Sequence, residues 1–125
     1  QKSAGIPGFP FAHLLDLSKK NANNYTYLQI AAKKNFIHVA KWLLKNGANV
    51  NAKHKDDKIV LHLAAELGNL RMVRLLLKVG AKVNALDSDQ DTPLDWAIGT
   101  LHNDTAQFLR NHGGKTGEEL KAEGK

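Results

Sequence analysis

Residues 60–85 read VLHLAAELGNLRMVRLLLKVGAKVNA, and this stretch decides the fold. Its parts recur 33 residues apart: Gly47-Ala48 returns as Gly80-Ala81, and Val50-Asn51-Ala52 returns as Val83-Asn84-Ala85. Three further sets keep that spacing, namely Leu28/Leu61/Leu94, Ala31/Ala64/Ala97 and Leu43/Leu76/Leu109. Self-similarity at one fixed period is typical of repeat proteins. The sequence therefore predicts three copies, which begin near Asn21, His54 and Asp87.

Each copy predicts one pair of helices. In the third copy, a polar turn at 87–91 precedes Thr92-Pro93. Threonine can accept a backbone N–H as N-cap, and proline suits the first helical position. In the second copy, Gly68 can end the first helix because glycine adopts the left-handed conformation. A longer helix follows and stops at Gly80, after which an extended segment leads to the next turn.

The pattern resembles the ankyrin repeat, whose motif runs Asp-x-x-Gly-x-Thr-Pro-Leu-His-x-Ala-Ala, then Gly, then Leu-Leu-x-x-Gly-Ala-x-Val-Asn-Ala. Residues 61–65, 76–81 and 83–85 carry this motif, and the resemblance covers about residues 21–116. It implies an all-α repeat fold, an α-solenoid of helix-turn-helix pairs linked by projecting β-hairpin loops. The expected units are ankyrin repeat 1 (21–53), ankyrin repeat 2 (54–86), a C-terminal capping repeat 3 (87–116) and a C-terminal helix or tail (117–125) opened by a Thr116/Glu119 capping box.

Several positions depart from the family's motif. The hairpin glycine is replaced by Asn24, Asp57 and Gln90, and glutamine tolerates positive φ poorly, so we expect the third hairpin tip to be distorted. Leu101 stands where the family has the glycine between helices. Ile59 removes the N-cap hydroxyl of the second copy, which should cost roughly 1 kcal/mol locally.

The two ends of the repeat region differ. Arg110 and Thr105 stand where the second copy has Leu77 and Met72, so the third copy is expected to turn a polar face outward, as a cap does. The first copy has the apolar pattern of an interior repeat. Residues 9–20 are interpreted as a degenerate N-terminal cap without a match to the repeat, and residues 1–8 as a flexible end. The alternative is that upstream repeats were removed. The candidate covering residues are Phe9, Phe11, Leu14, Leu15 and Leu17.

The composition narrows the function classes. The 125 residues carry no cysteine, which excludes disulfides, thiolate zinc sites and cysteine nucleophiles. The net charge of +6 is uneven, because residues 1–60 hold ten Lys/Arg against three Asp/Glu, whereas residues 61–125 hold eight against nine. A basic first half favours acidic partners.

Motifs that suggest chemistry are incomplete. Asp87-x-Asp89-x-Asp91 resembles the start of a calcium loop, but Thr92 and Ile98 stand at its glycine and glutamate positions. Gly114-Lys115-Thr116 lacks the first glycine of a phosphate-binding loop. The six histidines have no paired ligand spacing, and the resemblance implies a structural role for His62 near the hairpin base. It also raises hydroxylation of Asn51 and Asn84, against which a turn role is favoured. We therefore expect no enzyme activity, no metal and no cofactor.

The resemblance implies that a protein partner binds the concave side, which is made of the hairpin tips and the exposed sides of the first helices. Tyr25 and Trp96 are candidate aromatic anchors, although Trp96 can instead pack between repeats. The row runs from basic to acidic along the chain. The candidate contact residues are Asn23, Tyr25, Lys33, Lys34, Lys53, Lys55, Asp56, Lys58, Glu66, Leu67, Ser88, Asp89, Asp91, Trp96 and Thr100.

The leading hypothesis is a non-enzymatic protein-interaction module, a monomer that binds a protein with a charged surface and does not enter a membrane. One alternative is a structural fragment of a longer ankyrin array or scaffold. Another is nucleic-acid binding through the basic half, which is disfavoured by the aspartates at 87, 89 and 91 and by the presence of only three arginines. The family resemblance implies an intracellular, cytoplasmic location, or delivery of a bacterial protein into a host cell.

Overall fold

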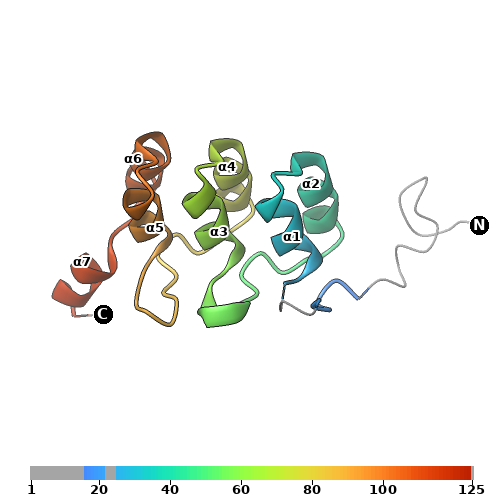
Figure 1. The fold of residues 1–125 in the computed structure, drawn as a ribbon, viewed down its shortest axis with the longest axis horizontal. Helices are drawn as coiled ribbons and strands as arrows, with labels where there is room; N and C mark the ends of the chain where they lie inside the picture. Colours follow the sequence, from blue (N-terminus) through green and yellow to red (C-terminus); the bar gives the residue numbers. More distant parts are fainter. Residues whose placement is uncertain (1–15, 22–24, 125) are drawn as a thin grey trace, which may run out of the picture.

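The computed structural model describes residues 16–21 and 25–124, which form one row of helix pairs (Figure 1). The first helices of the pairs lie side by side, the second helices form a parallel line beside them, and a last short helix closes the row. Among the described residues no strand is assigned, so the predicted hairpins are turns rather than β-ladders. The helices are α1 (Tyr27–Lys33), α2 (Ile37–Lys45), α3 (Val60–Leu67), α4 (Leu70–Lys78), α5 (Pro93–Gly99), α6 (Asn103–Asn111) and α7 (Gly117–Ala122), with a 3₁₀ turn η2 (Lys55–Asp57).

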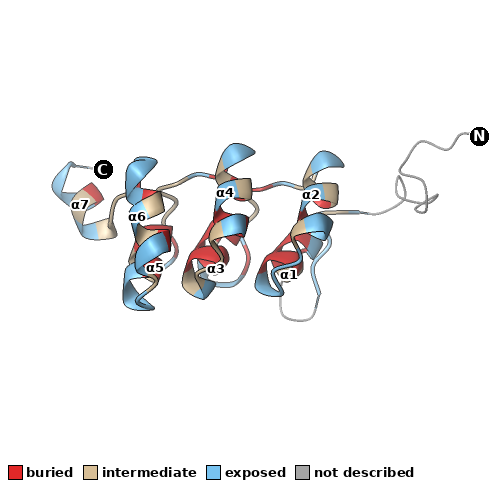
Figure 2. Ribbon diagram, turned by 90° about the horizontal axis from the view of Figure 1, so that it is seen from above, coloured by how far each residue is buried: buried red, intermediate tan, exposed pale blue. Residues whose placement is uncertain are grey.

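The apolar residues that repeat every 33 positions form the core. Leu61, Leu94 and Ala64 are fully buried between neighbouring pairs, and burial is concentrated on the facing sides of the helices (Figure 2). The second helices contribute Leu43, Leu76 and Leu109, of which the last two are fully buried. The repeat spacing therefore predicted the core residues correctly.

The helices α1, α5 and α7 each begin at a threonine N-cap, whereas α3 begins at Ile59. Thr92 and Thr116 accept backbone N–H groups from Asp95 and Glu119, which confirms both predicted N-caps. Ile59 has no hydroxyl to offer to α3. Its own N–H still donates to the side chain three residues later, here Nδ1 of His62 at 3.0 Å. The α3 helix therefore keeps the half of the capping box that its own side chain supplies and lacks the half that needs an N-cap hydroxyl.

One polar position ties each repeat to the next. Gln29 accepts the Thr26 N–H at 2.8 Å and donates from Nε2 to the Ala52 carbonyl at 3.0 Å. His62, 33 residues later, accepts the Ile59 N–H, so its Nε2 carries the proton and donates to the Asp91 carbonyl at 3.0 Å. The implied structural role of His62 is therefore confirmed by its contacts.

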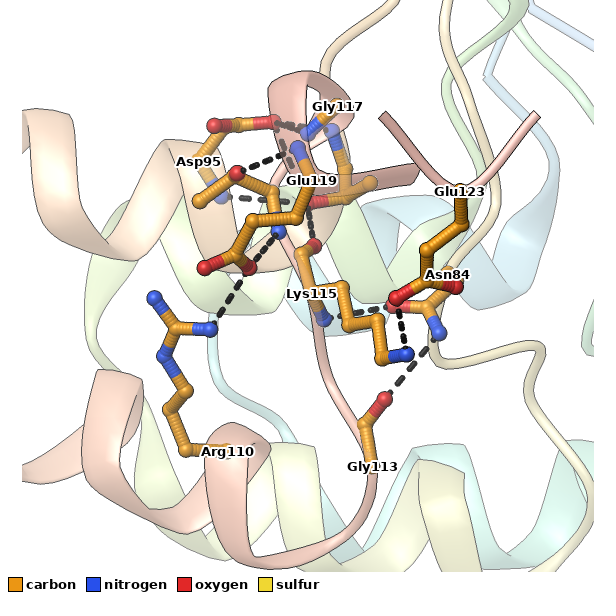
Figure 3. Close-up of polar contacts among 10 residues, drawn as sticks. Asn84, Asp95, Arg110, Gly113, Lys115, Gly117, Glu119 and Glu123 are labelled. Atoms are coloured by element: carbon orange, nitrogen blue, oxygen red, sulfur yellow. Dashed lines mark hydrogen bonds and ion pairs between the residues drawn. The ribbon is translucent and has the colours of Figure 1, made fainter. Parts of the chain in front are cut away.

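Asp95 occupies the same position in repeat 3 and completes the series. Its Oδ2 accepts the N–H of Thr92 at 2.9 Å and that of Gly117 at 2.8 Å, which joins α5 to α7 (Figure 3). Three different residue types thus hold the first-helix N-terminus and, at the same time, the following segment of chain.

The linker asparagines make a second set of ties. Asn51 donates from Nδ2 to the Gly80 carbonyl and accepts the Lys82 N–H at 2.9 Å. Asn84 repeats this with the Gly113 carbonyl at 3.0 Å and the Lys115 N–H at 2.7 Å (Figure 3). Because both ends of each amide are engaged between repeats, the contacts support the structural interpretation of these two residues.

The loop tips share one closure. The N–H of Asn21, His54 and Asp87 donates to the carbonyl four residues later at 2.8–3.0 Å. Gln90 does have a positive φ of 66°, yet the third tip keeps this hydrogen bond, so the expected distortion is wrong. The reason is that Oδ1 of Asp87 accepts two further N–H groups, which holds the tip in shape. The second tip differs from the third, since Asp56 and Asp57 both have positive φ, whereas Gln90 alone does so in the third.

The burial of Thr105 corrects a second prediction, which concerned the outer face of repeat 3. Thr105 is buried, like its equivalent Met72, whereas Val39 is exposed at the start of the row. This position therefore faces the preceding repeat, and the prediction that Thr105 contributes to a polar outer face is wrong. Arg110 is exposed and pairs with Glu119 of α7 at 2.6 Å, so only this residue fits the expected polar cap (Figure 3).

Leu101 is a strained position between α5 and α6. Its φ is 63° and it is 80 % exposed, whereas the equivalent Gly68 adopts the same conformation with φ 70°. A left-handed conformation costs a non-glycine residue about 1–2 kcal/mol, partly offset by the greater freedom of glycine in the unfolded chain. We therefore expect Leu101→Gly to raise the free energy of unfolding by about 0.5–1 kcal/mol in urea denaturation. Leu101→Ala, which keeps the strain, serves as control, and an equal gain there would contradict this explanation.

Candidate binding surface

The surface predicted to bind a partner comprises the loop tips and the exposed sides of α1, α3 and α5, and it is called the tip surface below. Asn23 lies outside the described residues. The second and third tips are neighbours, because the Ser88 N–H donates to the Asp56 carbonyl at 2.8 Å. The structure thus brings the candidate residues of repeats 2 and 3 together. The exposed members are Lys33, Lys34, Lys53, Lys55, Asp56, Leu67, Ser88, Asp89 and Thr100, and the half-buried ones are Tyr25, Lys58, Glu66, Asp91 and Trp96.

Two lysines of this surface lie over aromatic rings. Lys58 Nζ is 4.0 Å from the ring centroid of Trp96, and Lys33 Nζ is 5.2 Å from that of Tyr25. A cation over an aromatic face is attracted by the ring's negative quadrupole. Tyr25 and Trp96 therefore help to fix where the ammonium groups of Lys33 and Lys58 lie.

Trp96 is fixed by its own hydrogen bond. Its Nε1 donates to Oδ2 of Asp87 at 2.8 Å, while Lys58 covers its face. These contacts support the interpretation that Trp96 packs between repeats rather than standing free as an anchor. Thr100 is also engaged, because its hydroxyl donates to the Trp96 carbonyl at 2.7 Å at the end of α5.

The sequence reasoning missed one basic residue of this surface. Lys20 donates from Nζ to the carbonyl of Lys53 at 2.8 Å, so it extends the positive surface at repeat 1. The signal was present, since Lys20 precedes Lys53 by one period of 33 residues. It was overlooked because residues 9–20 were treated as lacking the repeat.

The acidic end of the surface lies at the third tip. Carboxylate oxygens of Asp87, Asp89 and Asp91 lie within 4.8 Å of one another. Burial, followed by the neighbouring charges of Asp95 and Asp87, raises the pKa of Asp91 above its usual value. Burial alone would also raise the pKa of Asp87, but hydrogen bonds from Asp91 and Trp96 outweigh it and hold this pKa below its usual value.

Asp87 is already committed as an acceptor. Its Oδ1 accepts the N–H of Asp89 and of Asp91, and its Oδ2 accepts the indole N–H of Trp96. A cation at this place would compete with all three hydrogen bonds. The arrangement is that of a hydrogen-bonded loop tip, as the sequence interpretation had it.

His54 lies at the base of the second tip and is 6 % exposed. Its ring packs against Tyr25, with 4.8 Å between the ring centroids. Burial, and next the positive charge of Lys58, lowers the pKa of His54 from 6.5 to about 4. The equivalent positions carry Asn21 and Asp87, whose side-chain oxygens accept N–H groups within their own tips. Histidine therefore makes the second tip sensitive to acid.

We expect the stability of the protein to fall between pH 6.5 and pH 4. In this window the unfolded chain binds a proton at His54 that the folded chain does not, so lowering the pH favours unfolding. The loss is about 2–3 kcal/mol. His54→Asn removes the titrating group and introduces the residue type that repeat 1 carries at the equivalent position, Asn21. The difference in unfolding free energy between the two proteins, measured in urea from pH 7 to pH 4, should change by that amount. A constant difference across the series would contradict the assignment.

These repeats match a known family. A sequence profile described as "Ankyrin repeats (3 copies)" matches residues 28–119. The chain belongs to the ankyrin repeat family. Ankyrin repeats are generally protein–protein interaction modules, and the predicted all-α repeat fold is confirmed.

One curated relative is a toxin. Over 45 residues the chain is 42 % identical to alpha-latroinsectotoxin-Lt1a of Latrodectus tredecimguttatus, a match that covers 36 % of this chain and 3 % of the toxin. The ankyrin chain thus spans a very small part of that relative. Within the described residues, no helix is both long enough and apolar enough to cross a membrane.

Proposed function

We propose that this ankyrin domain binds a protein partner through the tip surface, and that its lysines contact an acidic patch of that partner. The observation that carries the proposal is the set of positive side chains at the first two repeats. Five of these six side chains are exposed and Lys58 is half-buried. The set consists of Lys20, Lys33, Lys34, Lys53, Lys55 and Lys58.

The lysine–aromatic pairs support the choice of these residues. Holding Lys33 and Lys58 over rings reduces the side-chain freedom that a contact would otherwise remove. The charge pattern also favours one orientation, because Asp89 and Asp91 follow at the third tip. A partner whose acidic patch faces repeats 1 and 2 would keep its basic side chains near repeat 3. Such complementarity governs specificity and association rate.

The same pattern disfavours nucleic acid. A phosphate backbone that follows the row would meet the aspartates of the third tip after the lysines of the second. Arginines, which bind phosphate in a bidentate manner, are absent from the tip surface described above. Loss of the captured partner after nuclease treatment would indicate nucleic acid and would contradict the proposal.

A structural role inside a longer array is the second candidate. The face of repeat 1 that points away from repeat 2 exposes Tyr27, Phe36 and Val39, which are the kind of residues that a neighbouring unit covers. This role would leave binding to other parts of the array, so no protein would depend on the lysines of the tip surface.

The proposal is tested by reversing charges. In one variant Lys33, Lys34, Lys55 and Lys58 become Glu. The matched control reverses four exposed lysines of the second helices and linkers, Lys41, Lys45, Lys78 and Lys82, and so has the same net charge. Proteins from the source cells are captured on each form at low salt and quantified by mass spectrometry.

We expect a partner that the wild type and the control retain equally and that the tip variant retains about 100-fold less, because like charges then face each other. Equal retention by both variants would reject the tip lysines as the contact.

A further inference from the structure

One hydroxyl group of the tip surface differs from the others that share its sequence pattern. Three Ser or Thr residues are followed by an acidic residue three positions later, namely Ser88, Thr92 and Thr116. The Thr92 hydroxyl is buried and donates to the Lys115 carbonyl at 2.6 Å. The Thr116 hydroxyl accepts the N–H of Glu119 at 3.1 Å. Ser88 is exposed, and within the described part of the chain its hydroxyl makes no hydrogen bond. The structure therefore leaves Ser88 as the accessible hydroxyl of this pattern.

Ser88 lies at the third tip, in the loop between α4 and α5 that projects from the row of helices (Figure 1). Asp89, directly after it, is exposed, and Asp91, three residues after it, is half-buried. Protein kinases select substrates partly by charge pattern, and a kinase with a basic substrate groove selects serines that are followed by acidic residues. The segment Ser88-Asp89-Gln90-Asp91 carries that pattern on an accessible loop.

The neighbour of Ser88 in space is the basic second tip. The Ser88 N–H donates to the Asp56 carbonyl at 2.8 Å, and Lys55 directly precedes Asp56 in η2. Lys58 of the same tip extends to repeat 3, since its Nζ lies 4.0 Å from the ring centroid of Trp96. A negative group on Ser88 would therefore stand at the junction with a tip that carries two lysines.

We propose that Ser88 is a phosphorylation site for a kinase that selects acidic substrates, and that its phosphate pairs with Lys55 and Lys58. In the transfer, Oγ of Ser88 forms a bond to the γ-phosphorus of ATP. The bond from that phosphorus to the β–γ bridging oxygen breaks, ADP leaves, and the hydroxyl proton passes to a base of the kinase. The product carries a charge of about −1.5 to −2 at pH 7. Asp89 and Asp91 repel this group and the two lysines attract it, so both effects direct it to the second tip.

Phosphate transfer in vitro tests the site. The whole chain is incubated with ATP and purified casein kinase II, an enzyme that selects serines followed by acidic residues, and the phosphate is located by mass spectrometry. We expect a phosphate at Ser88, none at this position in Ser88→Ala, and a rate about 10-fold lower in Asp91→Asn. Asp104→Asn removes an exposed aspartate of α6, has the same net charge and should react at the wild-type rate. Absence of phosphate at Ser88, or equal rates for the two asparagine variants, would overturn the assignment.

Phosphorus NMR of the phosphorylated protein tests the pairing with the second tip. Positive groups near a phosphate favour its doubly charged form and so lower its second pKa. We expect the titration midpoint of the Ser88 phosphate to rise by about 0.5–1 pH unit in Lys55→Gln/Lys58→Gln. It should stay constant in the control Lys78→Gln/Lys82→Gln, which removes two exposed lysines away from the tips. Equal midpoints in all three proteins would overturn the pairing.

The consequence for binding rests on the function proposed above. Pairing with the phosphate withdraws Lys55 and Lys58 from an acidic partner, and the phosphate itself repels that partner. We expect the phosphorylated domain to retain the captured partner about 10-fold less than the unmodified domain. Equal retention by both forms would overturn this regulation. The phosphate transfer and the NMR titration involve no partner, so their outcome is separate from that of the proposed function.

Discussion

His62→Ala is expected to lower the free energy of unfolding by about 4 kcal/mol. The ring is fully buried, and it bonds both the N–H that opens α3 and the carbonyl of Asp91 in the next repeat. Alanine would leave a cavity and two buried backbone groups without their partner, at about 1–3 kcal/mol each. Since a domain of this size has about 5–15 kcal/mol of stability, the loss is a large part of the total. Urea denaturation followed by circular dichroism measures it.

His62→Gln is the matched control. Gln29 performs the same two tasks in repeat 1, accepting the Thr26 N–H and donating to Ala52. We therefore expect His62→Gln to cost less than about 1.5 kcal/mol, in the range of one altered hydrogen bond. If His62→Gln and His62→Ala were equally destabilising, the two hydrogen bonds of His62 would not be what stabilises this junction between repeats.

Asp95→Ala is expected to lower the free energy of unfolding by about 3 kcal/mol. A single carboxylate oxygen serves the N–H of Thr92 and of Gly117, so its removal uncaps α5 and releases α7 together (Figure 3). An N-cap contributes about 1 kcal/mol, and a hydrogen bond to a charged group about 1.5–3 kcal/mol. Hydrogen exchange should show the effect first at α7, where Leu120 would lose its cover.

Asp95→Asn separates the contact from the charge. An amide oxygen can accept the same two N–H groups, so the loss should stay near 1 kcal/mol. Gly117→Ala gives an independent check, because a Cβ there would lie 2.0 Å from the carbonyl oxygen of Gln90 and would force α7 away. An Asp95→Ala protein with wild-type exchange rates in α7 would show that this junction does not hold the last helix.

The 33-residue spacing predicted the fold and the core because burial repeats with the structural unit. Leu61 and Leu94 occupy the same position in consecutive repeats, 33 residues apart, and both are buried. The caps at Thr92 and Thr116 were also predictable, since a threonine hydroxyl directly before a helix can accept an N–H of its first turn. Local chemistry and periodicity thus cover most of the architecture.

Other features of the structure depend on contacts that cannot be inferred from the residue types involved. Gln29, His62 and Asp95 share one task, but no pattern of hydrophobicity or charge connects an amide, an imidazole and a carboxylate. The third tip keeps its shape despite the positive φ of Gln90, because Asp87 accepts an N–H of the same tip. The poor tolerance of glutamine for positive φ could not indicate that contact. Thr105 is polar and yet buried, since its direction is set by the helix and not by its type.

The tip surface was only partly predictable. That Lys33 and Lys55 are exposed follows from their positions in the repeat, and the structure agrees. The pairing of Lys58 with Trp96, and of Trp96 with Asp87, joins two repeats and cannot be inferred from either one alone. Lys20 belongs to the surface through its hydrogen bond to the Lys53 carbonyl, a contact between two repeats that the sequence does not show.

The most direct test of the proposed binding surface is hydrogen–deuterium exchange of this ankyrin domain with and without the captured partner. We expect slower exchange on binding at residues 33–34, 53–58 and 88–91, with the strongest protection at the second tip. The second helices α2, α4 and α6 should exchange at the same rate in both samples. Protection confined to those second helices, with unchanged exchange at the three tips, would contradict the account.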